Sequence, residues 1–312
     1  MTDSRSHKLF SFGTLLDEQV QKTLFGRTVP RSPAALAGHT TRPLPITDPA
    51  VIATSGLDVH LTLKREIGAV VEGAVLHLTD EDLAAADGYE VDDYARRRVL
   101  LSSGESAWAY LDAKPLRPAA RVVIVGDSIA YGRCDPAGGW TARLAAAHIA
   151  ANERDHRVFN LAVPGSTLAD VCEQTPALLA PRLPDTLLVA AGVNDSAEPL
   201  VAAPARSDGP AAVADRLASL AGTARRHNAR LVVAGPTWLD EARTGDHEGL
   251  RFTLARTAAL RETMRSWCAV NHVDFLDLWE PLRGRTELLS DGLHPTAGGH
   301  EVLHRYVTAV GH

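Results

Sequence analysis

The chain has 312 residues, of which 45% are hydrophobic and 22% are charged, as is typical of a globular protein with room for two domains. Its formal net charge is −6 and its basic residues are scattered, which argues against a nucleic-acid partner. No apolar stretch is long enough to span a bilayer, and residues 1–7 lack the apolar core of a signal peptide, so we expect a cytoplasmic protein without a membrane partner.

Strand-like segments dominate the N-terminal part of the chain. The apolar, β-branched and aromatic patterns predict strands at Lys8–Phe12, Gly68–Leu78, Arg97–Leu101 and Ala107–Leu111. Thr79 precedes three acidic residues, a pattern typical of a capped helix N-terminus. The stretch from Arg31 to Leu61 is rich in proline and threonine and favours no assignment. This order indicates a small α+β domain over residues 1–113.

A different pattern follows a short linker, which we place at residues 114–120 because two prolines bracket a polar stretch. Downstream, apolar strands alternate with amphipathic helices. The predicted strands are 121–126, 157–161, 186–191, 230–234 and 273–277, and the predicted helices are 139–152, 168–180, 211–228, 252–270 and 297–309. This alternation predicts an α/β domain with a parallel, doubly wound sheet over residues 121–312.

One strand end in this second domain carries a serine. The run 122–125 is apolar and stops at Gly126-Asp127-Ser128, which places a hydroxyl where open α/β sheets carry their chemistry. Three later polar blocks, 160–166, 192–195 and 291–295, also fall at predicted strand ends or loops. Taken singly, each block has a structural explanation as a helix cap, an Asx-turn or a surface loop. Taken together and in order, they indicate one site.

The four blocks resemble the GDSL, or SGNH, hydrolase family, from about residue 121 to the C-terminus. The residues that name the family match Ser128, Gly165, Asn194 and His294. The resemblance implies a flavodoxin-like fold with Ser128 as nucleophile, His294 as general base and Asp291 as the group that orients the imidazole. It also implies an oxyanion hole made by the backbone N–H groups of Ser128 and Gly165 and the side-chain amide of Asn194.

A second resemblance covers about residues 8–112. The turn Phe12-Gly13-Thr14-Leu15 and the later Asp87-Gly88-Tyr89-Glu90 are similar to motifs of the γ-glutamylcyclotransferase-like, or AIG2-like, family. The resemblance implies a mixed barrel in which Glu90 moves a proton while a γ-glutamyl amine cyclises to 5-oxoproline. It implies that Phe12, Gly13, Thr14 and Leu15 bind the substrate carboxylate through backbone N–H groups. The glycine that often follows the acid is Val91 here.

Together the two resemblances imply a bifunctional enzyme without a metal or other cofactor. Its small-molecule substrates would be an acyl ester or thioester and a γ-glutamyl amine, a pairing that suits natural-product tailoring. Three alternatives stay open: a non-catalytic, substrate-binding N-terminal domain, an acyltransferase in place of the hydrolase, or an inactive scaffold. The acyl group, the leaving group and the oligomeric state do not follow from the sequence.

The sequence also allows an interpretation of the cysteines and of one polar loop. The three cysteines are far apart in the sequence and form no metal-ligand pattern, and we interpret Cys134 as a residue that fills the core. Asp240, Asp246 and His247 fall in a polar loop after the fourth strand of the second domain, and we interpret this loop as solvated or as a substrate lid.

Overall fold

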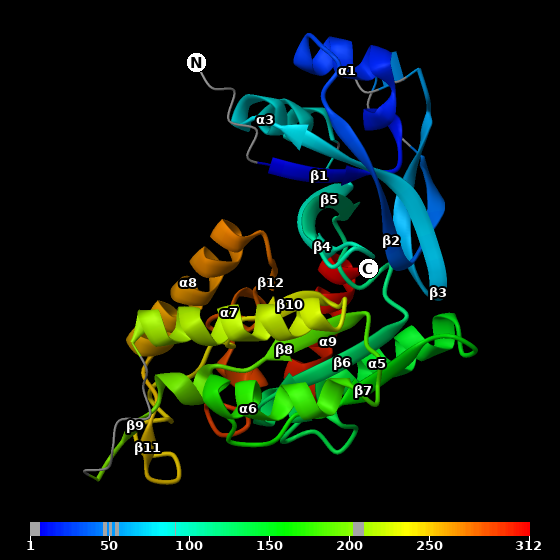
Figure 1. Cartoon of the computed structure of the whole chain (residues 1–312). Helices are drawn as coiled ribbons and strands as arrows, with labels where there is room; N and C mark the ends of the chain where they lie inside the picture. Colours follow the sequence, from blue (N-terminus) through cyan, green and yellow to red (C-terminus); the bar gives the residue numbers. More distant parts are fainter. Residues whose placement is uncertain (1–6, 46–48, 50–51, 54–55, 91, 202–208) are drawn as a thin grey trace. The chain divides into compact units, whose positions relative to one another are not determined.

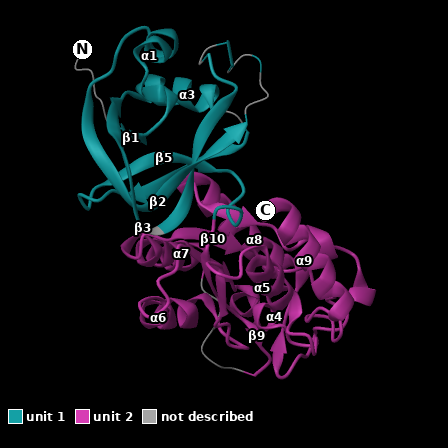
Figure 2. Ribbon diagram, turned by 90° about the vertical axis from the view of Figure 1, so that its right-hand side faces the viewer, with its two compact units in different colours: residues 1–118 teal, residues 119–312 magenta. Residues whose placement is uncertain are grey.

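The computed structural model describes residues 7–45, 49, 52–53, 56–90, 92–201 and 209–312, so Val91 lies outside the described residues. The chain divides into two compact units, residues 1–118 and residues 119–312, coloured separately in Figure 2. None of the helices in the described parts of either unit has the length and apolar character that crossing a membrane requires.

The first unit contains one mixed, five-stranded sheet in the order β2-β3-β1-β5-β4. Strand β1 pairs antiparallel with β3 and parallel with β5. The sheet curls (Figure 1), and near the ends of its edge strands the N–H of Ser102 donates to the carbonyl of Ala35 at 2.9 Å. The elements are β1 (His7–Ser11), η1 (Thr14–Leu16), α1 (Glu18–Phe25), β2 (Arg31–Pro45), β3 (Val59–Leu78), α3 (Asp80–Tyr89), β4 (Tyr94–Leu100) and β5 (Ser106–Asp112).

Alternation of side chains divides the core of this unit in two. Leu9, Trp108 and Tyr110 belong to a cluster that also includes residues of α1 and α3. Their strand neighbours belong to a second cluster, built from the strands of the curled sheet and the turns between them, with members Phe10, Leu36, Leu63, Val71, Val75, Val99, Leu101, Ala107, Ala109 and Leu111. The α+β class and the four expected strands are confirmed.

Strand β2, helix α1 and the first part of β3 were not predicted from the sequence. Strand β2 contains three prolines, which normally argue against a strand, but it lies at the edge of the sheet, where proline is tolerated. Strand β3 begins at Val59 rather than Gly68, as the partner of β2. The predicted cap of α3 is confirmed, since Thr79 and Asp82 form a reciprocal capping box.

The second unit is a five-stranded, fully parallel sheet in the order β12-β10-β8-β6-β7, between two layers of helices. This strand order confirms the flavodoxin-like, doubly wound sheet. Each expected element is present within a few residues: β6 (Arg121–Gly126), α5 (Gly139–Ala151), β7 (Arg157–Asn160), α6 (Leu168–Leu179), β8 (Thr186–Ala190), α7 (Pro210–Arg226), β10 (Arg230–Ala234), α8 (Leu254–Asn271), β12 (Asp274–Leu276) and α9 (Ala297–Gly311). Short elements lie in the connections: α4 (Ser128–Tyr131), η2 (Val193–Ser196), β9 (Glu198–Pro199), β11 (Leu250–Arg251), η3 (Glu280–Leu282) and η4 (Thr286–Leu288).

Buried side chains of the strands alternate between the two faces of this sheet. Val123, Leu187 and Val233 pack in one cluster with apolar residues of α6, α7 and α8. Helices α5 and α9 pack against each other and against the edge strands, and they cover the opposite face (Figure 1). Both faces are therefore covered, as a parallel sheet requires.

The end of β6 lies where the strand order reverses, because β7 pairs on one side of β6 and β8 on the other. Gly126, the last residue of β6, faces Ala190 of β8 so closely that a Cβ atom at position 126 would lie 2.2 Å from the Ala190 carbonyl oxygen. A glycine is required here by the space between two strands.

We predict that Gly126→Ala destabilises the second unit by at least 1–3 kcal/mol, because the added methyl group would force β6 and β8 apart. Urea unfolding followed by tryptophan fluorescence measures this, since Trp140, Trp238, Trp267 and Trp279 lie in residues 119–312. The matched control is Gly222→Ala in α7, where the added Cβ meets nothing closer than 3.5 Å, and it should stabilise the helix by about 0.5–1 kcal/mol. Equal unfolding midpoints for the two variants would contradict the packing argument.

Candidate active sites

Ser128 is held at the end of β6 by the residue before it. Asp127 is the N-cap of α4, and its carboxylate accepts a hydrogen bond from the Ile129 N–H at 2.9 Å. Burial raises the pKa of Asp127 to about 6, although backbone hydrogen bonds oppose that shift. Ser128, the first residue of α4, is 4% exposed. The strand, the cap and the short helix together fix the direction of the Ser128 hydroxyl.

The Ser128 hydroxyl belongs to a chain of three side chains. Its Oγ lies 2.8 Å from Nε2 of His294, and Nδ1 of His294 lies 2.7 Å from Oδ2 of Asp291. The other oxygen of Asp291 accepts the backbone N–H groups of Leu293 and His294 at 3.0 and 2.8 Å. Burial alone would raise the pKa of Asp291, but hydrogen bonds from His294 and from these two N–H groups hold the pKa well below its usual range. Asp291 is therefore a carboxylate that keeps the proton of His294 on Nδ1.

The loop after β7 is bonded to the end of β6, where the Val163 N–H donates to the Gly126 carbonyl at 3.0 Å, and to the loop after β8. The side-chain amide of Asn194 donates to the carbonyl of Ser166 at 3.0 Å, and the carboxylate of Asp195 accepts the N–H of Leu168 at 3.0 Å. Gly165 has φ +82°, a conformation that favours glycine, and nothing lies within 4 Å of where its Cβ would be. The Asn194 amide has a second hydrogen that this contact leaves free for a ligand.

Asn160 links β7 to the helix that carries Ser128, which the sequence analysis did not anticipate. Its side-chain amide donates to the Ala130 carbonyl and to the Thr141 hydroxyl, both at 2.9 Å, and its oxygen accepts the Ala162 N–H at 3.1 Å. The position of Asn160 at the end of a predicted strand was the available signal. The contacts themselves join residues far apart in the chain.

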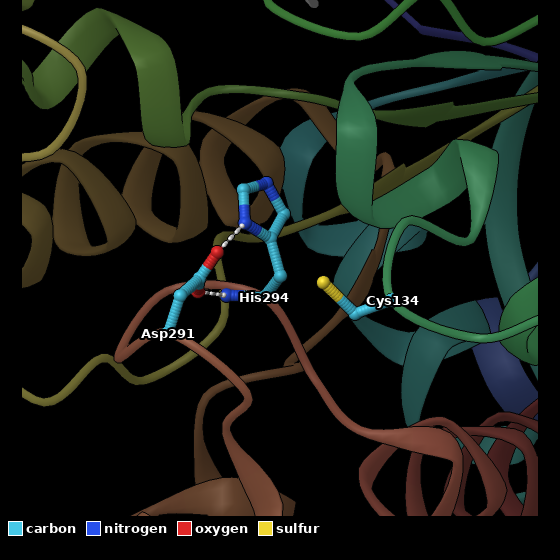
Figure 3. Close-up of side chains that lie close together, drawn as sticks. All are labelled: Cys134, Asp291 and His294. Carbon is cyan, nitrogen blue, oxygen red and sulfur yellow. Dashed lines mark hydrogen bonds and ion pairs between the residues drawn. The ribbon is translucent and has the colours of Figure 1, made fainter.

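Cys134 differs from its expected role, and His247 also lies near His294. Cys134 is exposed rather than a core residue, and its Sγ lies near Asp291 and His294 (Figure 3). The loop of His247 is mostly exposed, but the His247 side chain is only 13% exposed and its Nε2 lies 4.0 Å from Oδ2 of Asp291. Arg133 and Glu248 form a hydrogen-bonded ion pair at 2.8 Å. This pair connects the loop of His247 to the segment after α4. Neither neighbour could be found without the folded geometry, because both come from loops.

The first unit holds a pocket that is partly open to solvent. It brings together the predicted turn Phe12–Leu15 and the predicted acid Glu90, which follows the last turn of α3. His60, Tyr94 and Tyr110 also line the pocket and were not predicted from sequence. The first N–H groups of η1, at Thr14 and Leu15, have no partner within that short helix.

The electrostatics of this pocket keep Glu90 protonated at neutral pH. Burial, aided by the charge of Asp87, raises the pKa of Glu90 to about 8. Asp87 itself accepts a hydrogen bond from the Tyr110 hydroxyl at 2.8 Å and lies 2.9 Å from Nε of Arg96 in an ion pair. Burial also lowers the pKa of His60. A carboxyl group with a pKa of about 8 is a stronger base than an ordinary one, which suits proton transfer.

Comparisons with known proteins follow the same division of the chain. The model of the AIG2-like gamma-glutamyl cyclotransferase family matches residues 9–128, and the model of the GDSL-like lipase/acylhydrolase family matches residues 124–302. Both families expected from the sequence are thus found. No curated protein matches the chain.

Several solved structures share the fold of the second unit. A lipase/acylhydrolase from Enterococcus faecalis has 23% sequence identity and a TM-score of 0.50, and the match covers 61% of this chain and 95% of that one. An acetyl xylan esterase from Geobacillus stearothermophilus, solved as a variant, has 18% identity and a TM-score of 0.51, with coverage of 61% and 94%. An alpha/beta hydrolase from the metagenome of Lake Arreo in Spain has 20% identity and a TM-score of 0.50, with coverage of 62% and 94%. At these identities the likeness supports the fold.

The GDSL-like model spans more than half of the 312 residues and includes the loops that carry Ser128, Gly165, Asn194, Asp291 and His294. The chain belongs to the GDSL-like lipase/acylhydrolase family.

Proposed function

We propose that the second unit is a serine hydrolase that cleaves an acyl ester or thioester. The observation that carries the proposal is the hydrogen-bonded chain from Ser128 through His294 to Asp291, at 2.8 and 2.7 Å. A serine hydroxyl is a weak nucleophile unless a base accepts its proton as it attacks. Nε2 of His294 is in position to do so, because the Asp291 carboxylate holds the ring proton on Nδ1.

The reaction would run through an acyl-enzyme. Oγ of Ser128 attacks the carbonyl carbon while its proton passes to Nε2 of His294, and Asp291 stabilises the resulting imidazolium. His294 then returns the proton to the leaving oxygen or sulfur, which departs and leaves an ester on Ser128. A water molecule, deprotonated by His294, attacks that ester and releases the acid. An alcohol or amine in place of water would make the same site an acyltransferase.

Negative charge develops on the former carbonyl oxygen in each attack. The N–H groups of Ser128 and Gly165 and the free hydrogen of the Asn194 amide are the donors that we assign to this oxygen. Removing one such donor typically costs about 3 kcal/mol of transition-state stabilisation. The φ of Gly165, +82°, is a conformation that favours glycine, and glycine has no Cβ to keep a ligand away from its N–H.

We predict that Ser128→Ala abolishes hydrolysis of short activated esters by the full-length protein, and that adding His294→Ala costs little more. The two residues act as one unit, so their losses are not additive. Initial rates with an activated ester measure this, and Glu90→Gln serves as a matched control that should keep full esterase activity. Chromatography of products formed with added alcohols separates hydrolysis from acyl transfer. Undiminished rates in purified Ser128→Ala protein would refute the nucleophile.

We predict that Asn194→Ala lowers kcat by about 10²- to 10³-fold with little change in KM, because the charged oxygen exists only in the transition state. The Asn194→Ala variant also loses the hydrogen bond to Ser166, which can loosen the two loops. Asp195→Ala is the control for this effect, because it removes another hydrogen bond between the same loops. Asp195 ties the same loops together but offers no donor to the substrate. If Asp195→Ala reduced kcat as much as Asn194→Ala, loop order rather than the amide donor would explain the loss.

We also propose that the first unit is a γ-glutamylcyclotransferase. The observation that supports this is the shared pocket of Glu90 and the turn Phe12–Leu15. The free α-amine of a γ-glutamyl amine would attack its own γ-carbonyl carbon, closing a five-membered ring. Glu90 accepts a proton from the attacking nitrogen and returns it to the departing amine. The products are 5-oxoproline and the freed amine. The N–H groups of Thr14 and Leu15 would bind the α-carboxylate.

We predict that Glu90→Gln abolishes formation of 5-oxoproline from γ-glutamyl amines, while Ser128→Ala leaves it unchanged. A neutral amide keeps the shape of the side chain but cannot accept a proton. Because burial raises the Glu90 pKa to about 8, kcat/KM of the native protein should increase with pH through that value as the base ionises. Chromatographic assay of 5-oxoproline between pH 6 and 9 measures both effects. Release of free glutamate would refute cyclisation, and no reaction in the native protein would favour a binding module.

A further inference from the structure

Cys134, Asp291 and His294 bring three kinds of metal ligand together at the edge of the proposed hydrolase site. One ligand atom from each residue lies within 4.8 Å of the other two (Figure 3). A thiol, a carboxylate and an imidazole form a donor set that suits Zn²⁺ and related thiophilic cations and suits Mg²⁺ poorly. The proposed hydrolysis has no use for the thiol, which comes from the loop after α4.

We propose that these three residues form an inhibitory binding site for a thiophilic divalent cation such as Zn²⁺. Tetrahedral zinc holds neighbouring ligand atoms about 3.4–3.6 Å apart, given bond lengths of about 2.0–2.3 Å. The ligand atoms lie within 4.8 Å of one another, so shifts of about an ångström would bring them onto one ion. Cys134 is exposed, so its side chain can turn toward the ion without repacking a core.

The ion would take the place of one proton. Nδ1 of His294 now donates its hydrogen to Oδ2 of Asp291 at 2.7 Å. An ion between these two atoms binds the lone pair of Nδ1, so the proton of the neutral imidazole moves to Nε2. The Cys134 thiol loses its own proton to solvent and binds as the thiolate. No bond to carbon is made or broken, and nothing is oxidised.

This change of tautomer disables the proposed base. A neutral imidazole that carries its hydrogen on Nε2 can donate to Ser128 but has no lone pair there with which to accept the serine proton. Inhibition therefore requires no blockage of the substrate path. The inhibitory effect rests on the proposed hydrolase, whereas binding of the ion depends only on the three side chains, so the two can be tested separately.

The binding test uses Co²⁺, whose thiolate complexes absorb light through charge transfer from sulfur. Titration of the full-length protein with Co²⁺ should give this absorption in the native chain, in Ser128→Ala and in Cys172→Ala. Cys172 is the matched control, because it is a partly buried thiol on α6 that bonds to the Arg216 carbonyl at 3.4 Å, outside the cluster. Cys134→Ala should show no such absorption. Equal absorption in Cys134→Ala, or none in the native chain, would overturn the site.

The inhibition test follows ester hydrolysis with added Zn²⁺ and then with a chelator. Zn²⁺ should reduce the rate of the native protein more than tenfold, and the chelator should restore it. Cys134→Ala should keep the basal rate and require at least about tenfold more Zn²⁺ for half inhibition, since one ligand is lost. Inhibition of Cys134→Ala at the same Zn²⁺ concentration as the native protein would refute the proposal. Absence of esterase activity in the native protein would count against the proposed hydrolase and leave the cobalt test decisive for the site.

Discussion

The contact between β6 and β8 at Gly126 is the constraint on which the larger unit depends. A Cβ at this position would lie 2.2 Å from the Ala190 carbonyl oxygen, so the strands approach as closely as they do only because residue 126 has no side chain. The N–H of Asp127 continues this contact by donating to the same carbonyl at 3.2 Å. The chain leaves the sheet immediately afterwards, and Ser128 is therefore the first residue that can face the open end of the sheet.

Hydrogen bonds between loops, rather than apolar packing, organise the residues around Ser128. The loop after β7 is bonded to α4 through Asn160 and to the loop after β8 through Asn194. Asn194 and Ser166 are buried, and a buried polar group is costly to leave unsatisfied. These hydrogen bonds join the loops to one another and favour one arrangement of them. The apolar cluster beneath them supplies the support, since it packs α6, α7 and α8 on one face of the sheet.

The sequence predicts the second unit well because its signals are local. Each parallel strand is a short apolar run bounded by turn residues. Ser128 and Asn194 closely follow two such runs, and His294 lies in the turn before α9. The first unit is predicted less well from the sequence. The prolines of β2 are tolerated only at the edge of a sheet, and the sequence does not show which strand lies at the edge. The pocket partners His60 and Tyr110 come from different strands, and Cys134 and His247 approach Asp291 from separate loops, so no sequence spacing indicates them.

The Asn194–Ser166 hydrogen bond has a consequence for the entropy of the site. A buried amide held at 3.0 Å by a backbone carbonyl is 8% exposed and cannot rotate freely, so its remaining hydrogen points in one direction before any substrate arrives. In water, dipoles must reorient as charge develops, and that reorganisation is a large part of the barrier. In this protein the hydrogen bond to Ser166 fixes the direction of the Asn194 amide dipole once the chain has folded. The proposed oxyanion donor is thus preorganised.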